Sequence, residues 1–316
     1  MVNIYGNKAT RFGFGDALIE LGRKDEKIFV LGADTAASVA INGFQKEFPN
    51  RFINVGIAET NLLGMAAGLS VAGFIPFAAT YGVFASGRPW EQIRTTICYS
   101  NLNVKIGGSH SGLMVGYDGA THQALEEISI MRCLPHMTVI VPCDVVETKK
   151  ATMASAYYPG PVYIRYGRET IPTITQESDK FEIGKANVLK EGTDVCIAAC
   201  GTMVYEALSA SEILEKEGIK AQVLNIHTIK PIDKQAIIDS CKKCGAIVTA
   251  EEHQIFGGFG SAVAEVVVQN CPVPMEFVGI NDTFGESGKP ADLMVKYHLK
   301  DVDIVAAARK ALARKK

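Results

Sequence analysis

The sequence lacks any run of about 18 apolar residues, the length that a membrane-spanning helix needs. Its opening residues, MVNIYGNKATRFG, also lack the apolar core of a secretory signal. These two absences predict a cytoplasmic protein. In that compartment, the eight cysteines are expected to be mostly reduced.

An excess of charge of one sign is absent as well. The chain has 32 Lys and Arg against 34 Asp and Glu, a net charge of −2, which argues against nucleic acid as the main partner. Hydrophobic residues make up 47% of the 316 positions and charged residues 21%. The chain can therefore fill a core, and disorder is not expected.

Paired cysteines are scarce. Cys241 and Cys244 form a C-x-x-C motif, but no second pair at metal-binding spacing accompanies it. A zinc or thioredoxin-like site is one interpretation of this motif. The other, which we favour, is the end of a helix closed by Gly245.

What the sequence does contain is a regular alternation of apolar strand patterns and helix patterns. This order is typical of mainly parallel, twisted sheets flanked by helices, and the length suits two such domains. In the first domain we expect strands at 27–32, 52–55, 75–80, 104–107, 138–142 and 162–166, with helices at about 9–23, 58–72, 84–99, 122–133 and 145–157.

The alternation breaks at residues 169–186, where Pro172, several threonines and mixed charges predict a linker. We therefore divide the chain into an α/β domain at 1–172, a linker at 173–187 and a second α/β domain at 188–316. In the second domain we expect strands at 194–199, 221–226, 246–250 and 275–280, helices at 202–217, 233–244 and 258–270, and a C-terminal helix.

The densest polar stretch is GGSHSGLMVGYDGATHQALEE, residues 107–127, which follows a strand and precedes a helix. Ligands of open parallel sheets bind at the carboxyl ends of the strands, and His110, Asp118 and His122 fall there. We expect the five glycines of the stretch to let its backbone approach a ligand closely. A structural alternative is that Thr121 caps the following helix and Asp118 stabilises the turn. The spacing matches no strong metal site.

Three other positions have both a structural and a functional interpretation. Glu59 begins a helix among apolar neighbours, and an acid in a first turn is favoured by the helix dipole alone. Tyr81 and Phe84 lie where a strand turns into a helix and suit an ordinary core. Arg165 and Arg168 end the last strand of the first domain, where they could bind phosphate or form an exposed ion pair.

The glycines of AEEHQIFGGFGSAVAEVV open a helix after a strand of the second domain. They form a poor dinucleotide fingerprint, because the final glycine and the downstream acid are missing. Close packing of the helix on the strand is the better interpretation of Gly257, Gly258 and Gly260.

In this order, GIAETNLLGMAAGLS, DGATHQALEEISIMRCLPHMTVIVPCD, IRYGRETIP and AEEHQIFGGFGSA resemble the C-terminal part of transketolases. The resemblance covers nearly the whole chain and implies a pyrimidine-binding domain followed by a smaller C-terminal domain. It implies a thiamine-diphosphate enzyme of carbohydrate metabolism, by default of the pentose phosphate pathway. Such an enzyme transfers a two-carbon ketol unit from a ketose phosphate to an aldose phosphate.

The resemblance also implies roles for single residues. Glu59 would hydrogen-bond the aminopyrimidine ring of the cofactor and favour its imino tautomer, and Tyr81 and Phe84 would pack on that ring. Asp118 would hold a hydroxyl of the donor sugar. His122 would contact the hydroxyl or carbonyl beside the reacting carbon.

The remaining implied roles concern the phosphate end of the substrate. His110 matches a substrate histidine near that end, and Arg11, Ser38 and Arg168 match the sugar-phosphate anchors. Arg168 aligns better than Arg165, although the sequence leaves both open.

One family motif is missing. The GDG motif and its downstream Asn, which hold Mg²⁺ and the diphosphate, occur nowhere at the proper place. The resemblance therefore implies half of a split transketolase, active only with an N-terminal subunit that carries this motif and the metal ligands. A two-fold heterotetramer would follow from sites shared across subunits.

The sequence leaves other functions open. The chain could be the beta subunit of a 2-oxo-acid dehydrogenase, a deoxyxylulose-phosphate-synthase-like enzyme, or a non-catalytic regulatory or binding homologue. The set of His110, Asp118, His122 and Arg168 favours sugar phosphates, and the presence of Glu59 favours catalysis.

Overall fold

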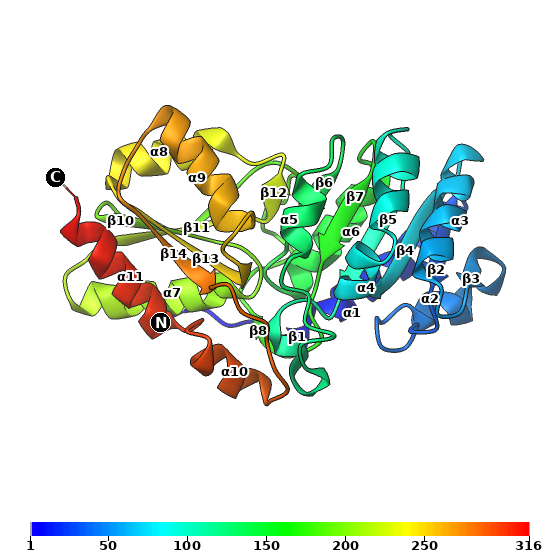
Figure 1. The fold of residues 1–316 in the computed structure, drawn as a ribbon, viewed down its shortest axis with the longest axis horizontal. Helices are drawn as coiled ribbons and strands as arrows, with labels where there is room; N and C mark the ends of the chain where they lie inside the picture. The colour runs from blue at the N-terminus through cyan, green and yellow to red at the C-terminus, as the bar shows by residue number, and fades with distance from the viewer. Residues whose placement is uncertain (1, 316) are drawn as a thin grey trace.

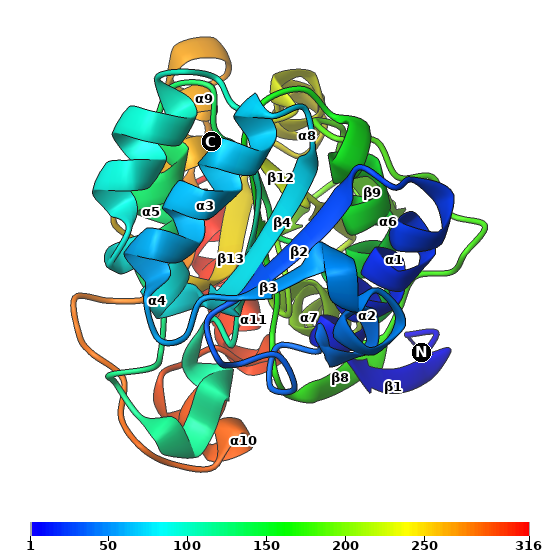
Figure 2. The same ribbon diagram turned by 90° about the vertical axis from the view of Figure 1, so that its right-hand side faces the viewer.

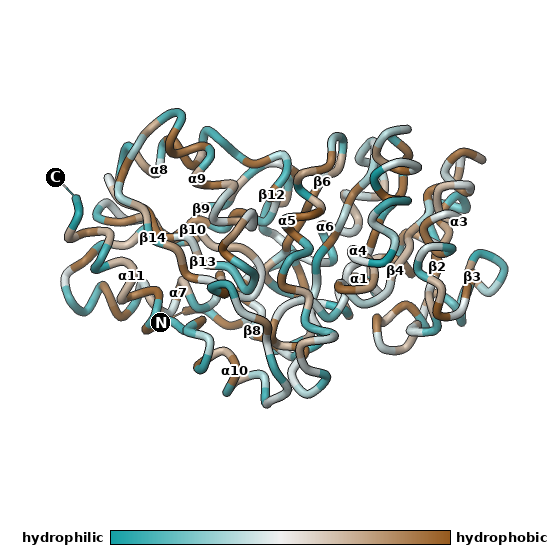
Figure 3. The backbone as a smooth tube through the Cα atoms, in the orientation of Figure 1, coloured by the Kyte–Doolittle hydropathy of each residue, from teal (hydrophilic) through white to brown (hydrophobic). Residues whose placement is uncertain are grey.

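The computed structural model describes residues 2–315, which fold into two α/β lobes lying side by side (Figure 1). Residues 1 and 316, the outer limits of the two predicted domains, lie outside the described residues. Apolar segments lie mostly in the strands and helices of the interior, and hydrophilic segments gather in outer loops and at the C-terminal end (Figure 3).

The first lobe is built on a seven-stranded sheet with the order β12-β6-β7-β5-β4-β2-β3, in which only β12 is antiparallel to its neighbour. Its strands are β2 (Ile28–Gly32), β3 (Phe52–Asn54), β4 (Ile75–Tyr81), β5 (Lys105–Ser109), β6 (Thr138–Ile140), β7 (Val162–Arg165) and β12 (Thr228–Lys230). β5, β6 and β7 are buried over their whole length, as expected for strands of a parallel sheet that helices cover on both faces.

Helices cover both faces of this sheet (Figure 2). One face carries α1 (Thr10–Lys24), α2 (Asn42–Glu47) and α6 (Val145–Tyr157), and the other carries α3 (Glu59–Val71), α4 (Gly82–Gly87) and α5 (Glu127–Arg132). Three further helical segments are the 3-10 turns η1 (Pro49–Arg51) and η3 (Leu113–Asp118) and the π-helix η2 (Gln92–Cys98).

The second lobe has a five-stranded sheet with the order β14-β13-β10-β11-β9. Its strands are β9 (Asn187–Lys190, antiparallel), β10 (Val195–Ala199), β11 (Ala221–Asn225), β13 (Ile247–Gln254) and β14 (Met275–Ile280). Helices α7 (Met203–Lys216) and α11 (Asp301–Ala313) lie on one side, and α8 (Lys234–Cys244) and α9 (Phe259–Asn270) on the other (Figure 1). A short helix, α10 (Pro290–Lys296), precedes α11.

The predicted fold class is confirmed, and two strand pairings were not predicted. β8 (Thr170–Thr173) pairs antiparallel with β1 (Gly6–Ala9), and β12, from the C-terminal half of the chain, joins the first sheet beside β6. Such short strands lack a readable pattern because partners distant in the sequence create them. The exact boundaries at 172 and 188 stay a prediction.

Two predicted helices are shorter than expected. The helix predicted at 84–99 is interrupted after Gly87, and Pro89 follows at the break. The helix predicted at 122–133 begins only at Glu127, so Thr121 does not cap it. The Thr121 hydroxyl instead lies 2.9 Å from His122 Nδ1.

The structural interpretation of the C-x-x-C motif is confirmed. Helix α8 ends at Cys244, and Gly245 closes it in the left-handed conformation with φ +67°. Both cysteines are buried. Within residues 2–315, no three His, Cys, Asp or Glu side chains gather as a metal site, and no helix is long and apolar enough to cross a membrane.

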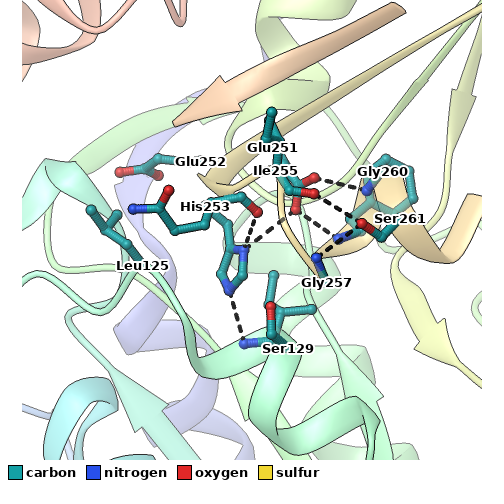
Figure 4. A network of polar contacts seen from close by, with 12 residues as sticks. Leu125, Ser129, Glu251, Glu252, His253, Ile255, Gly257, Gly260 and Ser261 are labelled. Carbon is teal, nitrogen blue, oxygen red and sulfur yellow. Dashed lines mark hydrogen bonds and ion pairs between the residues drawn. The ribbon is translucent and has the colours of Figure 1, made fainter. Parts of the chain in front are cut away.

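The glycine-rich start of α9 also has the packing role that we favoured. A Cβ on Gly260 would lie 2.6 Å from the Phe277 ring and 2.8 Å from Thr249 Oγ1. The backbone N–H groups of Phe259 and Gly260 donate to the Glu251 carboxyl at 2.6 and 2.8 Å (Figure 4). The helix N-terminus thus binds a carboxyl of the chain's own β13.

Polar groups cross the junction between the lobes. Arg165 Nε lies 2.5 Å from Glu127 Oε1 within the first lobe, and Arg165 Nη2 donates across the junction to the Glu252 carbonyl at 2.7 Å. The Ile128 N–H donates to His253 Nε2 at 3.2 Å (Figure 4). All these side chains are buried, so the second lobe docks on the first through a buried, hydrogen-bonded contact.

Candidate active site

Side chains of the candidate site gather at the carboxyl ends of β4, β5 and β7, the edge at which open parallel sheets bind ligands. Tyr81 ends β4 and Ser109 ends β5, and the two are direct partners in the parallel ladder. His110 follows β5 and Arg168 follows β7. The sheet thus brings together residues that are far apart in the sequence.

Glu59 is the first residue of helix α3 and is only 4% exposed. Glu59 Oε2 accepts a hydrogen bond from Arg88 Nη1 at 3.0 Å. The sequence pointed to apolar neighbours and the helix dipole for this acid, and the structure adds the ion pair with Arg88. Helix N-terminus and guanidinium together hold the carboxylate in one orientation.

Arg88 is the residue that the sequence analysis missed. Its guanidinium lies over the Phe84 ring, 4.3 Å from the centroid, while its side chain stays about half exposed. The available signal was its position four residues after Phe84, a spacing that puts two side chains on one helical face.

Aromatic rings form a layer beside Glu59. The rings of Tyr81 and Phe84 are nearly parallel, with centroids 6.1 Å apart, and both stay half-buried. The His110 ring stacks on Tyr81 at 4.1 Å, and His122 meets Phe84 edge-on at 5.3 Å. The two aromatic residues therefore form the surface of the site instead of joining the fully buried core.

His110 is held as a neutral ring. It is 1% exposed, adopts a left-handed backbone with φ +56°, and has Nδ1 2.8 Å from Ser109 Oγ. Burial, with the nearby positive charges of Arg11, Arg168 and His122, lowers the pKa of His110 to about 3. Strained backbone at a non-glycine residue is concentrated at functional sites.

Positive charge lines the same edge. Arg168 Nη1 lies 3.3 Å from Asp118 Oδ2, and both side chains are about one-third exposed. Arg11 Nη1 donates to the Ser38 carbonyl at 2.8 Å, and its Nε is buried without a hydrogen-bond partner. Arg165 points into the lobe junction and has no access to this edge.

The five loop glycines have a packing role, and the expectation that their backbone approaches a ligand stays a prediction. The space that a Cβ would occupy is filled by the protein itself at all five positions. The neighbours are Phe14 for Gly107, Tyr163 for Gly108, Glu252 for Gly112, Pro290 for Gly116 and Ser287 for Gly119. Three of these neighbours belong to the second lobe, so these glycines allow the two lobes to approach.

Family models and relatives match the chain along its length. Residues 7–173 match the model described as transketolase, pyrimidine binding domain, and residues 184–304 match transketolase, C-terminal domain. A putative transketolase C-terminal section from Methanocaldococcus jannaschii is 47% identical over 97% of each chain. The 6-deoxy-6-sulfo-D-fructose transketolase subunit SqwH from Clostridium sp. (strain MSTE9) is 45% identical over 95% of this chain and 93% of the relative.

A solved structure has the same architecture. It is described as a split gene transketolase, an inactive beta4 tetramer, and it superposes with a TM-score of 0.92 at 50% identity. The superposition covers 98% of this chain and 99% of the other.

Proposed function

Because this chain belongs to the transketolase family, we propose that it is the C-terminal subunit of a split, thiamine-diphosphate-dependent transketolase. The assembled enzyme transfers a two-carbon ketol unit from a ketose phosphate to an aldose phosphate. The observation that carries the proposal is the buried Glu59 carboxyl, held by Arg88 beside the half-buried rings of Tyr81 and Phe84.

The residues present fit the pyrimidine end of thiamine diphosphate. A flat heterocycle stacks well on parallel aromatic rings, and Tyr81 and Phe84 offer such rings. Glu59 supplies a carboxyl that can hydrogen-bond a ring nitrogen. When bound, the cofactor supplies the carbon nucleophile and the electron sink for cleavage of a ketose.

The polar residues of the edge suit a sugar with an anionic end. Asp118 accepts hydrogen bonds from a donor hydroxyl, and His122 contacts the oxygen beside the reacting carbon. His110, as a neutral ring, donates or accepts one hydrogen bond without adding charge. Arg11 and Arg168 bind the phosphate, and the Ser38 carbonyl orients Arg11.

The names of the relatives support a divided enzyme. One is called a C-terminal section, another a subunit, and the matching structure an inactive tetramer. We assign the diphosphate site and Mg²⁺ to an N-terminal subunit bearing a GDG motif and a downstream Asn. The two subunits form one site between them, in a heterotetramer.

Affinity purification of this chain from its native cells, followed by mass spectrometry, tests the proposal. We expect one stoichiometric partner with the GDG motif, and a complex that binds thiamine diphosphate in the presence of Mg²⁺. A complex that lacks such a subunit, or that binds no cofactor, would overturn the proposal.

A further inference from the structure

A loop of the first lobe carries two of the proposed substrate residues, Asp118 and His122. We call residues 111–123 the substrate loop. A segment of the second lobe, residues 284–290, packs against this loop, and we call it the brace. Through its contacts with the substrate loop, the brace lets the second lobe hold Asp118 and His122 in place.

Gln123 ties the substrate loop to the brace. Its side chain is 3% exposed, and Nε2 donates to the Glu286 carbonyl at 2.9 Å and to the Leu113 carbonyl at 3.2 Å. One amide thus links the end of the loop, its beginning and the brace. Gly285 allows this approach, because a Cβ there would lie 2.0 Å from Gln123 Oε1.

Two loop glycines lie directly against the brace. Gly119 has φ +74°, and a Cβ there would lie 2.5 Å from Ser287 Oγ. Gly116 has φ +77°, and a Cβ there would lie 3.0 Å from Pro290 Cγ. The brace therefore packs against the loop backbone on both sides of Asp118.

The beginning of the loop is fixed to the second lobe as well. The Met114 N–H donates to Glu252 Oε1 at 2.7 Å, and Thr202 Oγ1 donates to Glu252 Oε2 at 2.8 Å. Leu113 is fully buried in the apolar cluster that contains the core of the second lobe. The loop conformation is thus set largely from outside its own lobe.

We propose that Gln123 is a positioning residue: together with the brace, it fixes the substrate loop so that Asp118 and His122 face the donor sugar. Gln123 itself does not touch the substrate. The consequence for substrate binding rests on the proposed function, whereas the clamp itself is a property of this chain alone.

Hydrogen–deuterium exchange of the substrate loop in the purified chain tests the clamp without any activity. In Gln123→Ala and in Gly285→Ala we expect exchange of peptides covering 111–123 to accelerate about tenfold, the change expected for one lost buried hydrogen bond. Glu286→Ala is the matched control. It removes the ion pair with Lys296 and the hydrogen bond from the Tyr297 hydroxyl but keeps the carbonyl that Gln123 binds.

The reconstituted enzyme gives the second readout. For Gly285→Ala, we expect the KM for the ketose donor to rise about tenfold with a smaller change in kcat, while Glu286→Ala behaves as wild type. Gly285→Ala adds one methyl group to a half-buried loop residue and leaves the Gln123 side chain in place, so this variant carries the test where Gln123→Ala fails to fold. Unchanged exchange in the folded variants would overturn the clamp. Faster exchange with an unchanged KM would overturn its role in positioning.

Discussion

At the scale of single residues, the site depends on charges held in fixed places. The Glu59 carboxyl has a helix N-terminus and a guanidinium as its neighbours, and Asp118 is paired with Arg168. A hydrogen bond to a charged group in such surroundings is stronger than one between neutral groups. The proposed roles of these side chains can therefore be tested one at a time.

Glu59→Gln keeps the size of the side chain and removes its charge. If Glu59 acts in proton transfer at the pyrimidine ring, kcat of the reconstituted enzyme should fall about 100-fold or more. Steady-state turnover with a ketose phosphate measures the effect, and the exposed Glu91→Gln serves as control. Near-normal turnover of Glu59→Gln would refute the proposed role.

Arg168→Ala tests the phosphate anchor. Loss of a hydrogen bond to a charged group predicts that the KM for a phosphorylated donor rises ten- to hundredfold. The KM for an unphosphorylated ketose should change less, because that donor loses only the effect of Arg168 on Asp118. Equal changes for both donors would show that Arg168 shapes the site without contacting phosphate.

At the scale of elements, one aspartate joins a helix to the chain that leaves the first lobe. Asp144 caps α6 by accepting from the Glu147 N–H at 2.9 Å, and it also accepts from the backbone of Ile174 and Thr175 at 2.8 and 2.6 Å. Asp233 caps α8 with longer bonds, to Ala236 N at 3.1 Å and Ala186 N at 3.0 Å.

Asp144→Ala should lower the free energy of unfolding by about 2 kcal/mol or more, since it removes a cap and leaves buried N–H groups without partners. Asp233→Ala should cost about 1 kcal/mol. Urea denaturation of both variants makes the comparison. An effect of Asp144→Ala no larger than that of Asp233→Ala would contradict this account of the junction.

The main strands and helices could be predicted because a buried parallel strand is a short apolar run and a surface helix has its own period. β1, β8, β9 and β12 escaped prediction, since each is three or four residues long and owes its place to a distant partner. The same reason hid the role of the loop glycines. Gly112, Gly116 and Gly119 face the second lobe, which no local pattern reveals.

At the scale of the whole molecule, a buried histidine, His227, lies where the two halves of the chain meet. His227 is fully buried, stacks on Phe181 at 4.3 Å, and lies next to β12, the strand by which the C-terminal half joins the first sheet. Burial lowers the pKa of His227 to about 4. Acid should therefore weaken the contact between the halves of the chain.

The sign of this effect follows from linkage. As pH falls from 6.5 to 4, His227 takes up a proton in the unfolded chain before it does so in the folded chain. The free energy of unfolding therefore falls by up to about 3 kcal/mol over this range. His227→Gln should flatten this part of the stability profile, measured by denaturation at several pH values. His298→Gln, at an exposed position, is the control. An equally steep profile in His227→Gln would contradict the assignment.

Turnover of a ketose phosphate and an aldose phosphate tests the central claim most directly, with thiamine diphosphate and Mg²⁺ present. The chain alone, the N-terminal partner alone and their equimolar mixture are compared. We predict that only the mixture is active. Equal activity of the chain alone, or an inactive mixture that nevertheless binds thiamine diphosphate, would contradict the account.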